Sequence, residues 1–165
     1  MPIPSENPVR SLYASLLDEW NRRNADGFAH LFTEDGSAVG FDGSQMNGPS
    51  EIRAVLGKIF ADHPTASYVS VVREVRYLGS EVALLRAVVG MVPPGASDIN
   101  PAVNAIQSLV AEKQKLGWRV ALLHNTPAAF HGRPDLGEKL TEEIRAALRA
   151  KNQDRAVERR RPHSG

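Results

Sequence analysis

The spacing of apolar residues changes near residue 66, and this change limits the possible folds more than any other feature of the chain. Before that point, apolar residues recur every three or four positions in three segments, as they do on one face of a helix. After it, from Ser67 to Pro127, they alternate with polar residues or form short continuous runs, as in strands. Helices followed by a run of strands indicate an α+β fold in which helices cover a sheet.

Turn-forming residues divide both halves of this pattern into elements. Helices are predicted before Asn24, around Phe28 and from Ser50 to Asp62, and a turn is predicted at 33–36. A short hairpin is predicted in residues 37–47, around Asp-Gly-Ser. Four long antiparallel strands are predicted in residues 67–78, 82–92, 102–116 and 118–126.

The 165 residues are expected to form one domain with additions at both ends. We expect a flexible N-terminal segment in residues 1–7 and the α+β domain in residues 8–134. Helical spacing returns in residues 135–150 and predicts a C-terminal helix. Residues 151–165 are highly charged and include Arg159–Arg161, so we expect a solvated, disordered tail.

Composition excludes several classes of function. The formal net charge is +1, so neither nucleic acid nor a membrane surface is an expected partner. No apolar run approaches the roughly 20 residues of a membrane helix, and the N-terminus lacks a signal-peptide pattern. The absence of cysteine fits a reducing compartment, so we expect a cytoplasmic protein. The five histidines show no metal-binding spacing, so no metal site is expected.

The last predicted strand ends in hydrogen-bonding side chains, in the stretch WRVALLHNTPAAFHG. Strict alternation places His124 on the same face as Val120 and Leu122, and Asn125 on the opposite face. His124 is a candidate general acid or base, a buried histidine bonded to a backbone carbonyl, or a dimer-face residue. Asn125 bonds either a ligand or a partner across the sheet or an interface. Only one of the two can face an interior cavity while the strand stays regular.

Other polar residues interrupt apolar strands and need partners. Asn104, Gln107 and Ser108 are each expected to bond a ligand, a second subunit or a neighbouring strand. Arg86 is expected to pair with Glu74 or Glu112, at a dimer face or within the sheet, in preference to binding an anion.

Five large side chains are candidates for lining a cavity under the helices. Each of them singly is what an apolar core requires, but together they would line a pocket between helices and a curved sheet. They are Tyr13, Trp20, Phe41, Met46 and Phe60.

Four motifs, FDGSQM, ADHPTA, MVPPG and NTPAAFHGRP, occur in this order in the chain. Over residues 9–148 the sequence resembles SgcJ/EcaC-type proteins, a SnoaL-like branch of the nuclear transport factor two-like superfamily. The resemblance implies a cone-shaped half-barrel in which a curved antiparallel sheet wraps around a long N-terminal helix. It also implies a pocket at the open end and a homodimer formed through the outer sheet face. Asp35, otherwise a turn former, would then present its carboxylate near the pocket mouth.

The resemblance leaves several functions open. The leading hypothesis is a pocket protein in secondary metabolism for an apolar, polyketide-like or steroid-like ligand. An enzyme of this kind would be a cofactor-free isomerase, dehydratase or cyclase, in which Asp35 or His124 moves a proton. Asn125 or Tyr13 would hold a carbonyl oxygen.

The first alternative is a non-catalytic ligand-binding or dimeric assembly protein. The second is an oxidoreductase, the label that the branch often carries. No glycine-rich nucleotide motif follows a predicted strand, so no cofactor is expected.

Overall fold

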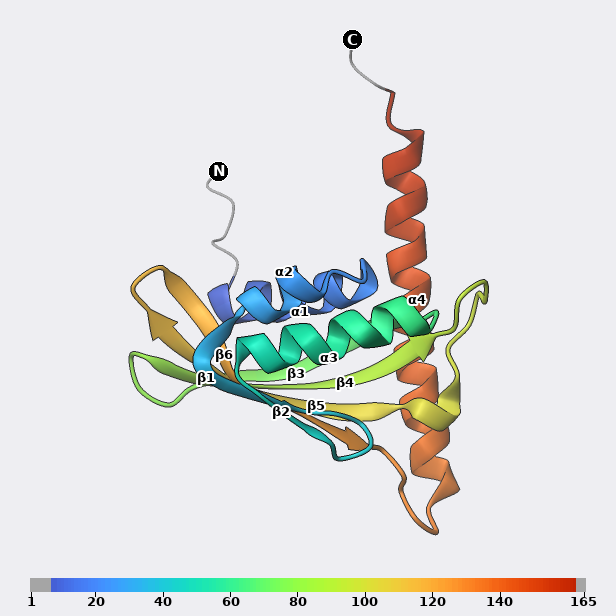
Figure 1. The fold of residues 1–165 in the computed structure, drawn as a ribbon. Coiled ribbons are helices and arrows are strands. Elements are labelled where there is room, and N and C mark those ends of the chain that lie inside the picture. The colour runs from blue at the N-terminus through green and yellow to red at the C-terminus, as the bar shows by residue number, and fades with distance from the viewer. Residues whose placement is uncertain (1–6, 163–165) are drawn as a thin grey trace.

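The computed structural model describes residues 7–162 and contains helices packed on one continuous sheet (Figure 1). The helices are α1 (Pro8–Asn21), α2 (Ala25–His30), α3 (Pro49–Asp62), the short 3-10 helix η1 (Pro101–Val103) and α4 (Pro134–Arg160). The strands are β1 (Phe32–Val39), β2 (Gln45–Asn47), β3 (Ser67–Tyr77), β4 (Val82–Val92), β5 (Ala105–Gln114) and β6 (Gly117–Pro127). The predicted flexible N-terminal segment lies outside the described residues except for Asn7.

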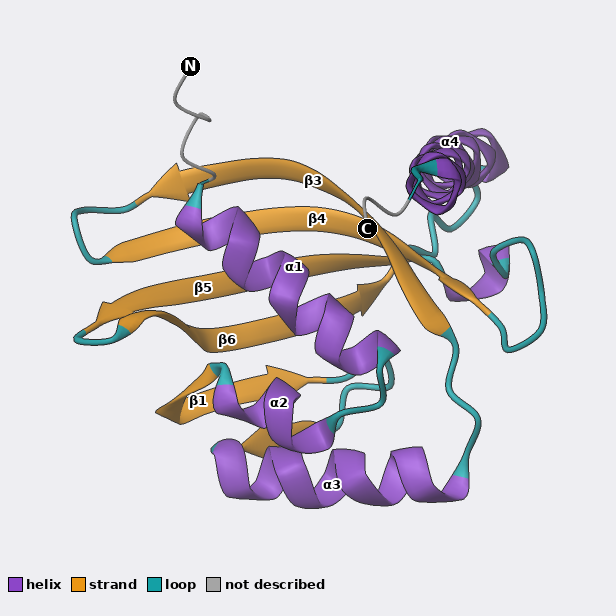
Figure 2. Cartoon of the chain, turned by 90° about the horizontal axis from the view of Figure 1, so that it is seen from above, coloured by secondary structure: helices purple, strands orange, loops and turns teal. Residues whose placement is uncertain are grey.

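The six strands form a sheet in the order β2-β1-β6-β5-β4-β3. β1 and β6 are parallel, and all other neighbours are antiparallel. Helices α1, α2 and α3 lie over one face, here called the inner face (Figure 2). The opposite face is called the outer face, and α4 packs beside β3 and β4 at one end of the sheet. The predicted α+β fold with a curved sheet and an extra C-terminal helix is confirmed.

Asn7 and Pro8 start helix α1. The Asn7 Oδ1 atom accepts hydrogen bonds from the backbone N–H groups of Val9 and Arg10, which have no partner inside the helix. Pro8 lies in the first turn, where a backbone N–H would have no partner within the helix, so its lack of an N–H removes no helical hydrogen bond. The apolar spacing predicted from the sequence becomes the buried face of the helix, and it brings Tyr13 onto the sheet.

Strand β1 begins at Phe32, so the turn predicted for residues 33–36 is wrong. Its pairing with β6 shifts between Phe32 and Ser37, so the turn-forming residues lie in an irregular stretch of the strand. A Cβ atom on Gly36 would lie 2.7 Å from the carbonyl oxygen of Val120. Glycine is therefore required there by the close approach of the two backbones.

Strand β6 contains a bulge at Ala121. Val120 pairs with Ala111 and Leu122 pairs with Val110, so Ala121 is the extra residue. The bulge reverses the alternation of faces beyond it. Strict alternation was therefore wrong to put His124 on the same face as Val120.

Helix α4 extends to Arg160, whereas the sequence predicted an end at residue 150 and disorder beyond it. Residues 151–160 contain good helix formers and no glycine or proline, so nothing in them stops the helix. The half of α4 nearer to the sheet buries Leu140 and Ile144 against Val69 and Val88 of the outer face. Among the described residues, no helix is both long enough and apolar enough to cross a bilayer.

Candidate functional site

Four side chains form a hydrogen-bonded chain on the inner face, here called the inner tetrad: Tyr13, Gln107, Asn125 and Tyr68. The Tyr13 hydroxyl donates to Gln107 Oε1 at 2.6 Å. Gln107 Nε2 donates to Asn125 Oδ1 at 3.1 Å, and Asn125 Nδ2 donates to the Tyr68 hydroxyl at 3.3 Å. Tyr13 and Gln107 are 1% exposed, so the tetrad lies inside the apolar core.

Each member of the inner tetrad comes from a different element. Tyr13 lies on the buried stripe of α1, and Tyr68 lies near the start of β3. Gln107 of β5 stands opposite Asn125 of β6 in the strand register, which puts their amide groups within reach. The bulge in β6 is what turns Asn125 inward.

Burial keeps both tyrosines of the tetrad protonated. It raises the pKa of Tyr13 well above its usual range, and the neighbouring Tyr68 raises the pKa further. Burial also raises the pKa of Tyr68, while hydrogen bonds with Asn125 and Gln107 oppose that rise. The inner tetrad is therefore neutral at neutral pH and offers hydrogen-bond donors and acceptors without a charged group.

Aromatic rings pack beside the tetrad. The ring of Trp20 lies 5.1 Å from that of Phe60 and 5.4 Å from that of Tyr68, and its Nε1 donates to the Ala66 carbonyl at 3.0 Å. Met46 packs against the same core. Three of the predicted lining residues, Trp20, Phe60 and Met46, thus flank the inner-face core that holds the tetrad.

Two other predicted ligand-binding residues lie elsewhere. Phe41 is 39% exposed in the turn between β1 and β2. Asn104 is buried, but its Nδ2 donates to Thr141 Oγ1 of α4 at 3.0 Å, away from the tetrad.

A cavity of about 520 Å³ lies between the end of α1, the start of β3, the 93–97 loop and α4. We call it the α1–α4 cavity. Tyr68 belongs both to its lining and to the inner tetrad. The charged groups around it are one carboxylate and four cations: Asp18, Arg22, Arg23, Lys151 and Arg155.

Asp35 and His124 are both exposed, and neither belongs to the inner tetrad. Asp35 lies in β1, where its Oδ1 accepts a hydrogen bond from Thr33 Oγ1 at 3.0 Å. His124 stands opposite Ser108 of β5 and Val39 of β1, on the outer side of the bulged strand. Their assignment as proton-transfer residues stays a prediction. The described residues contain no cluster of metal-ligating side chains.

Sequence reasoning missed Tyr68 and left open whether Gln107 bonds a ligand, a second subunit or a neighbouring strand. Gln107 gave a signal, because a glutamine in a strand covered on that face must find a partner. Tyr68 gave no such signal, because tyrosine is common in strands and does not by itself indicate a site.

The curved sheet covered by three helices has the α+β fold of solved cystatin-like and NTF-2 like structures. The chain matches the SnoaL-like domain family over residues 9–129 and belongs to that family. A comparison with curated proteins gave no match.

Solved structures of the same fold support this assignment. A domain of unknown function with a cystatin-like fold from Nostoc punctiforme is 22% identical, with a TM-score of 0.72 over 96% of this chain and 99% of that chain. An NTF-2 like protein from Shewanella oneidensis is 18% identical, with a TM-score of 0.61 over 75% and 99%. A ketosteroid isomerase-like protein from Erwinia carotovora atroseptica is 16% identical, with a TM-score of 0.58 over 76% and 98%. At these identities the similarity shows the fold.

Proposed function

We propose that the protein binds an apolar small molecule through one oxygen function, which the inner tetrad holds by hydrogen bonds. The observation that carries this proposal is the chain of three hydrogen bonds among four largely buried, neutral side chains. Stability does not require such a chain, because apolar groups of the same shape can replace paired polar groups at little cost. A ketone or hydroxyl group suits it, since hydroxyls and amides both donate and accept.

The α1–α4 cavity is the proposed route to the tetrad. Its volume of about 520 Å³ lies within the roughly 300–1,000 Å³ of small-molecule sites. Tyr68 is common to the cavity lining and the tetrad, so a ligand entering there approaches the tetrad from its Tyr68 end.

Binding without chemistry is the better-supported function, because the tetrad contains no carboxylate or imidazole that could take up a proton. The second candidate is a cofactor-free isomerase, dehydratase or cyclase acting on a polyketide-like or steroid-like substrate. Two buried, protonated tyrosines favour it, since such donors stabilise a developing oxyanion. Likeness in fold to the ketosteroid isomerase-like protein supports it as well.

The catalytic candidate can be tested with a β,γ-unsaturated steroid ketone, whose conversion to the conjugated ketone is followed by ultraviolet absorbance. Asp35→Asn or His124→Gln would lower the rate at least about tenfold if either residue moves the proton. No conversion above the buffer rate would contradict isomerisation of a steroid-like ketone.

Placement in the SgcJ/EcaC-type branch, a cytoplasmic location and a role in secondary metabolism belong to the same proposal. The branch and the role in secondary metabolism rest on the four motifs FDGSQM, ADHPTA, MVPPG and NTPAAFHGRP, and the cytoplasmic location rests on the absence of cysteine.

A homodimer through the outer sheet face is also proposed. Leu84, Val110 and Leu122 stand opposite one another on adjacent strands and form a half-buried apolar row. Light scattering at tens of micromolar protein tests this: a dimer that Val110→Asp dissociates supports it, and a wild-type monomer contradicts it.

The ligand-binding proposal is tested with naphthol, an apolar body with one hydroxyl, and with naphthalene, which lacks the hydroxyl. We expect wild-type protein to bind naphthol about tenfold more tightly, and Tyr68→Phe or Asn125→Leu to remove the difference. Tyr77→Phe is the matched control, because Tyr77 is exposed at the far end of β3. Equal binding of the two probes by wild-type protein would refute the proposal.

A further inference from the structure

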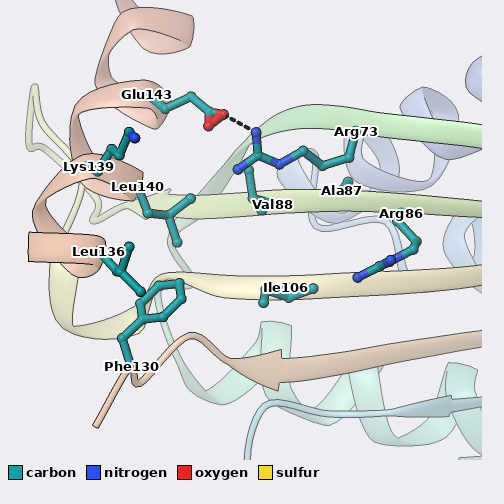
Figure 3. A pocket seen from close by; sticks show the side chains of 10 residues that line it. All are labelled: Arg73, Arg86, Ala87, Val88, Ile106, Phe130, Leu136, Lys139, Leu140 and Glu143. Carbon is teal, nitrogen blue, oxygen red and sulfur yellow. Dashed lines mark ion pairs between the residues drawn. The ribbon is translucent and has the colours of Figure 1, made fainter. Parts of the chain in front are cut away.

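We propose that a groove between α4 and the outer sheet face binds an amphipathic carboxylate, such as a medium-chain fatty acid. This site is separate from the inner tetrad. The groove has a volume of about 430 Å³ and is called the α4 groove (Figure 3). Strands β4 and β5 form its floor, and α4 with the loop before it forms its wall.

The α4 groove has an apolar centre. Val88 and Ile106 lie on its floor, and Phe130, Leu136 and Leu140 face them from the wall (Figure 3). Phe130 has a φ of 43°, in the left-handed region that bulky residues rarely adopt. Its ring faces the groove (Figure 3), and backbone strain of this kind gathers at ligand-binding sites.

The rim of the α4 groove carries more positive than negative charge. Its lining contains three cations, Arg73, Arg86 and Lys139, and one carboxylate, Glu143. Glu143 is already paired with Arg73 at 2.7 Å (Figure 3). Within residues 7–162, no carboxylate lies at salt-bridge distance from Lys139.

Arg86 lies on the floor of the groove and forms the predicted ion pair with Glu74, but this pair is long and leaves the guanidinium open to an anion. Its Nη1 atom lies 3.7 Å from Glu74 Oε1, which is longer than a hydrogen bond, and its side chain is 56% exposed. Ser108 stands opposite Arg86 on β5, and His124 stands opposite Ser108 on β6. A ligand carboxylate at Arg86 would therefore have a hydroxyl and an imidazole in the same cross-strand row.

The apolar body of the ligand would extend from that row over Val88 and Ile106 toward Phe130. Charge complementarity favours a single anion joined to an apolar chain over a neutral apolar molecule. A second copy of the chain is the competing occupant. The proposed dimer row, Leu84, Val110 and Leu122, lies on the other side of Arg86 and Ser108, so a dimer formed there leaves the groove open.

The test is calorimetric titration of the full chain with decanoate, decanol and decyltrimethylammonium, each below its micelle concentration. We expect decanoate to bind about tenfold more tightly than decanol, and the cation to bind more weakly than either. Arg86→Gln should remove the preference for decanoate. Arg76→Gln is the matched control, because Arg76 is an exposed arginine of β3 that does not line the groove.

Two further variants separate this site from the others. Leu136→Gln should weaken decanoate and decanol binding equally, whereas Tyr68→Phe should change neither.

Equal affinity for decanoate and decanol would overturn the proposal, as would an effect of Arg76→Gln equal to that of Arg86→Gln. Loss of decanoate binding in Tyr68→Phe would assign the ligand to the interior, and loss of binding on dimerisation would assign the groove to a second copy. Both results contradict the proposed site.

Discussion

Asn125 and His124 are neighbours in sequence with opposite environments. Asn125 bridges Gln107 and Tyr68 on the inner face, whereas His124 is exposed. Asn125→Leu would leave a buried amide and a hydroxyl without a partner, so we expect it to lower the unfolding free energy by about 1–3 kcal/mol. His124→Gln should change it by less than about 0.5 kcal/mol. Urea unfolding measures both, and a larger loss in His124→Gln would contradict the inward position of Asn125.

The buried tyrosines predict loss of stability at high pH. Above about pH 10, an unfolded tyrosine releases its proton, whereas Tyr13 and Tyr68 hold theirs because burial raises the pKa of both. The folded state then binds more protons, so the unfolding free energy falls as pH rises, by about 1.4 kcal/mol per pH unit for each tyrosine.

The control for this prediction is the third tyrosine of the chain. Tyr13→Phe and Tyr68→Phe should each flatten the fall between about pH 10 and 11, measured by urea unfolding. Tyr77→Phe should not flatten the fall, because Tyr77 is 46% exposed. The phenylalanine ring would also keep the contact with Trp118. Equal slopes in all three variants would refute the burial argument.

At the scale of elements, the sequence was informative where one periodicity held and misleading where it broke. The apolar spacing predicted α1 and the long strands because each buries one regular face. A single extra residue at Ala121 reversed the faces of β6, and no local signal marks that bulge. The charged end of α4 was read as disordered, although charged residues such as arginine, lysine and glutamate are good helix formers.

The distal part of α4 is predicted to contribute little to stability. Residues 153–160 are all exposed, whereas Ile144 is fully buried against the outer face. Truncation after Asn152 should therefore change the unfolding free energy by less than about 0.5 kcal/mol. Ile144→Ala should lower it by about 2–5 kcal/mol because it leaves a cavity. A large loss on truncation, measured by urea unfolding, would show that the distal helix is part of the core.

For the whole molecule, the fold was easier to predict than the site. The order of elements follows from local patterns, and the family motifs strengthened it. The inner tetrad does not follow from them, because Tyr13 and Gln107 are 94 positions apart and meet only when α1 packs on β5. Asn125 was recognised as a candidate, but its partners depend on the sheet register. Asp35 and His124 were chosen for their chemistry, and the fold brings neither of them into the tetrad.

The central claim is that the inner tetrad recognises the oxygen of an apolar ligand. The most direct test is NMR of the side-chain amides of Asn125 and Gln107 during titration with naphthol. The account predicts shifts of both amide groups and contacts between the naphthol ring and Tyr68, with no change on addition of naphthalene. Unchanged amide signals at saturating naphthol, or contacts confined to Ile106 and Phe130 of the α4 groove, would contradict it.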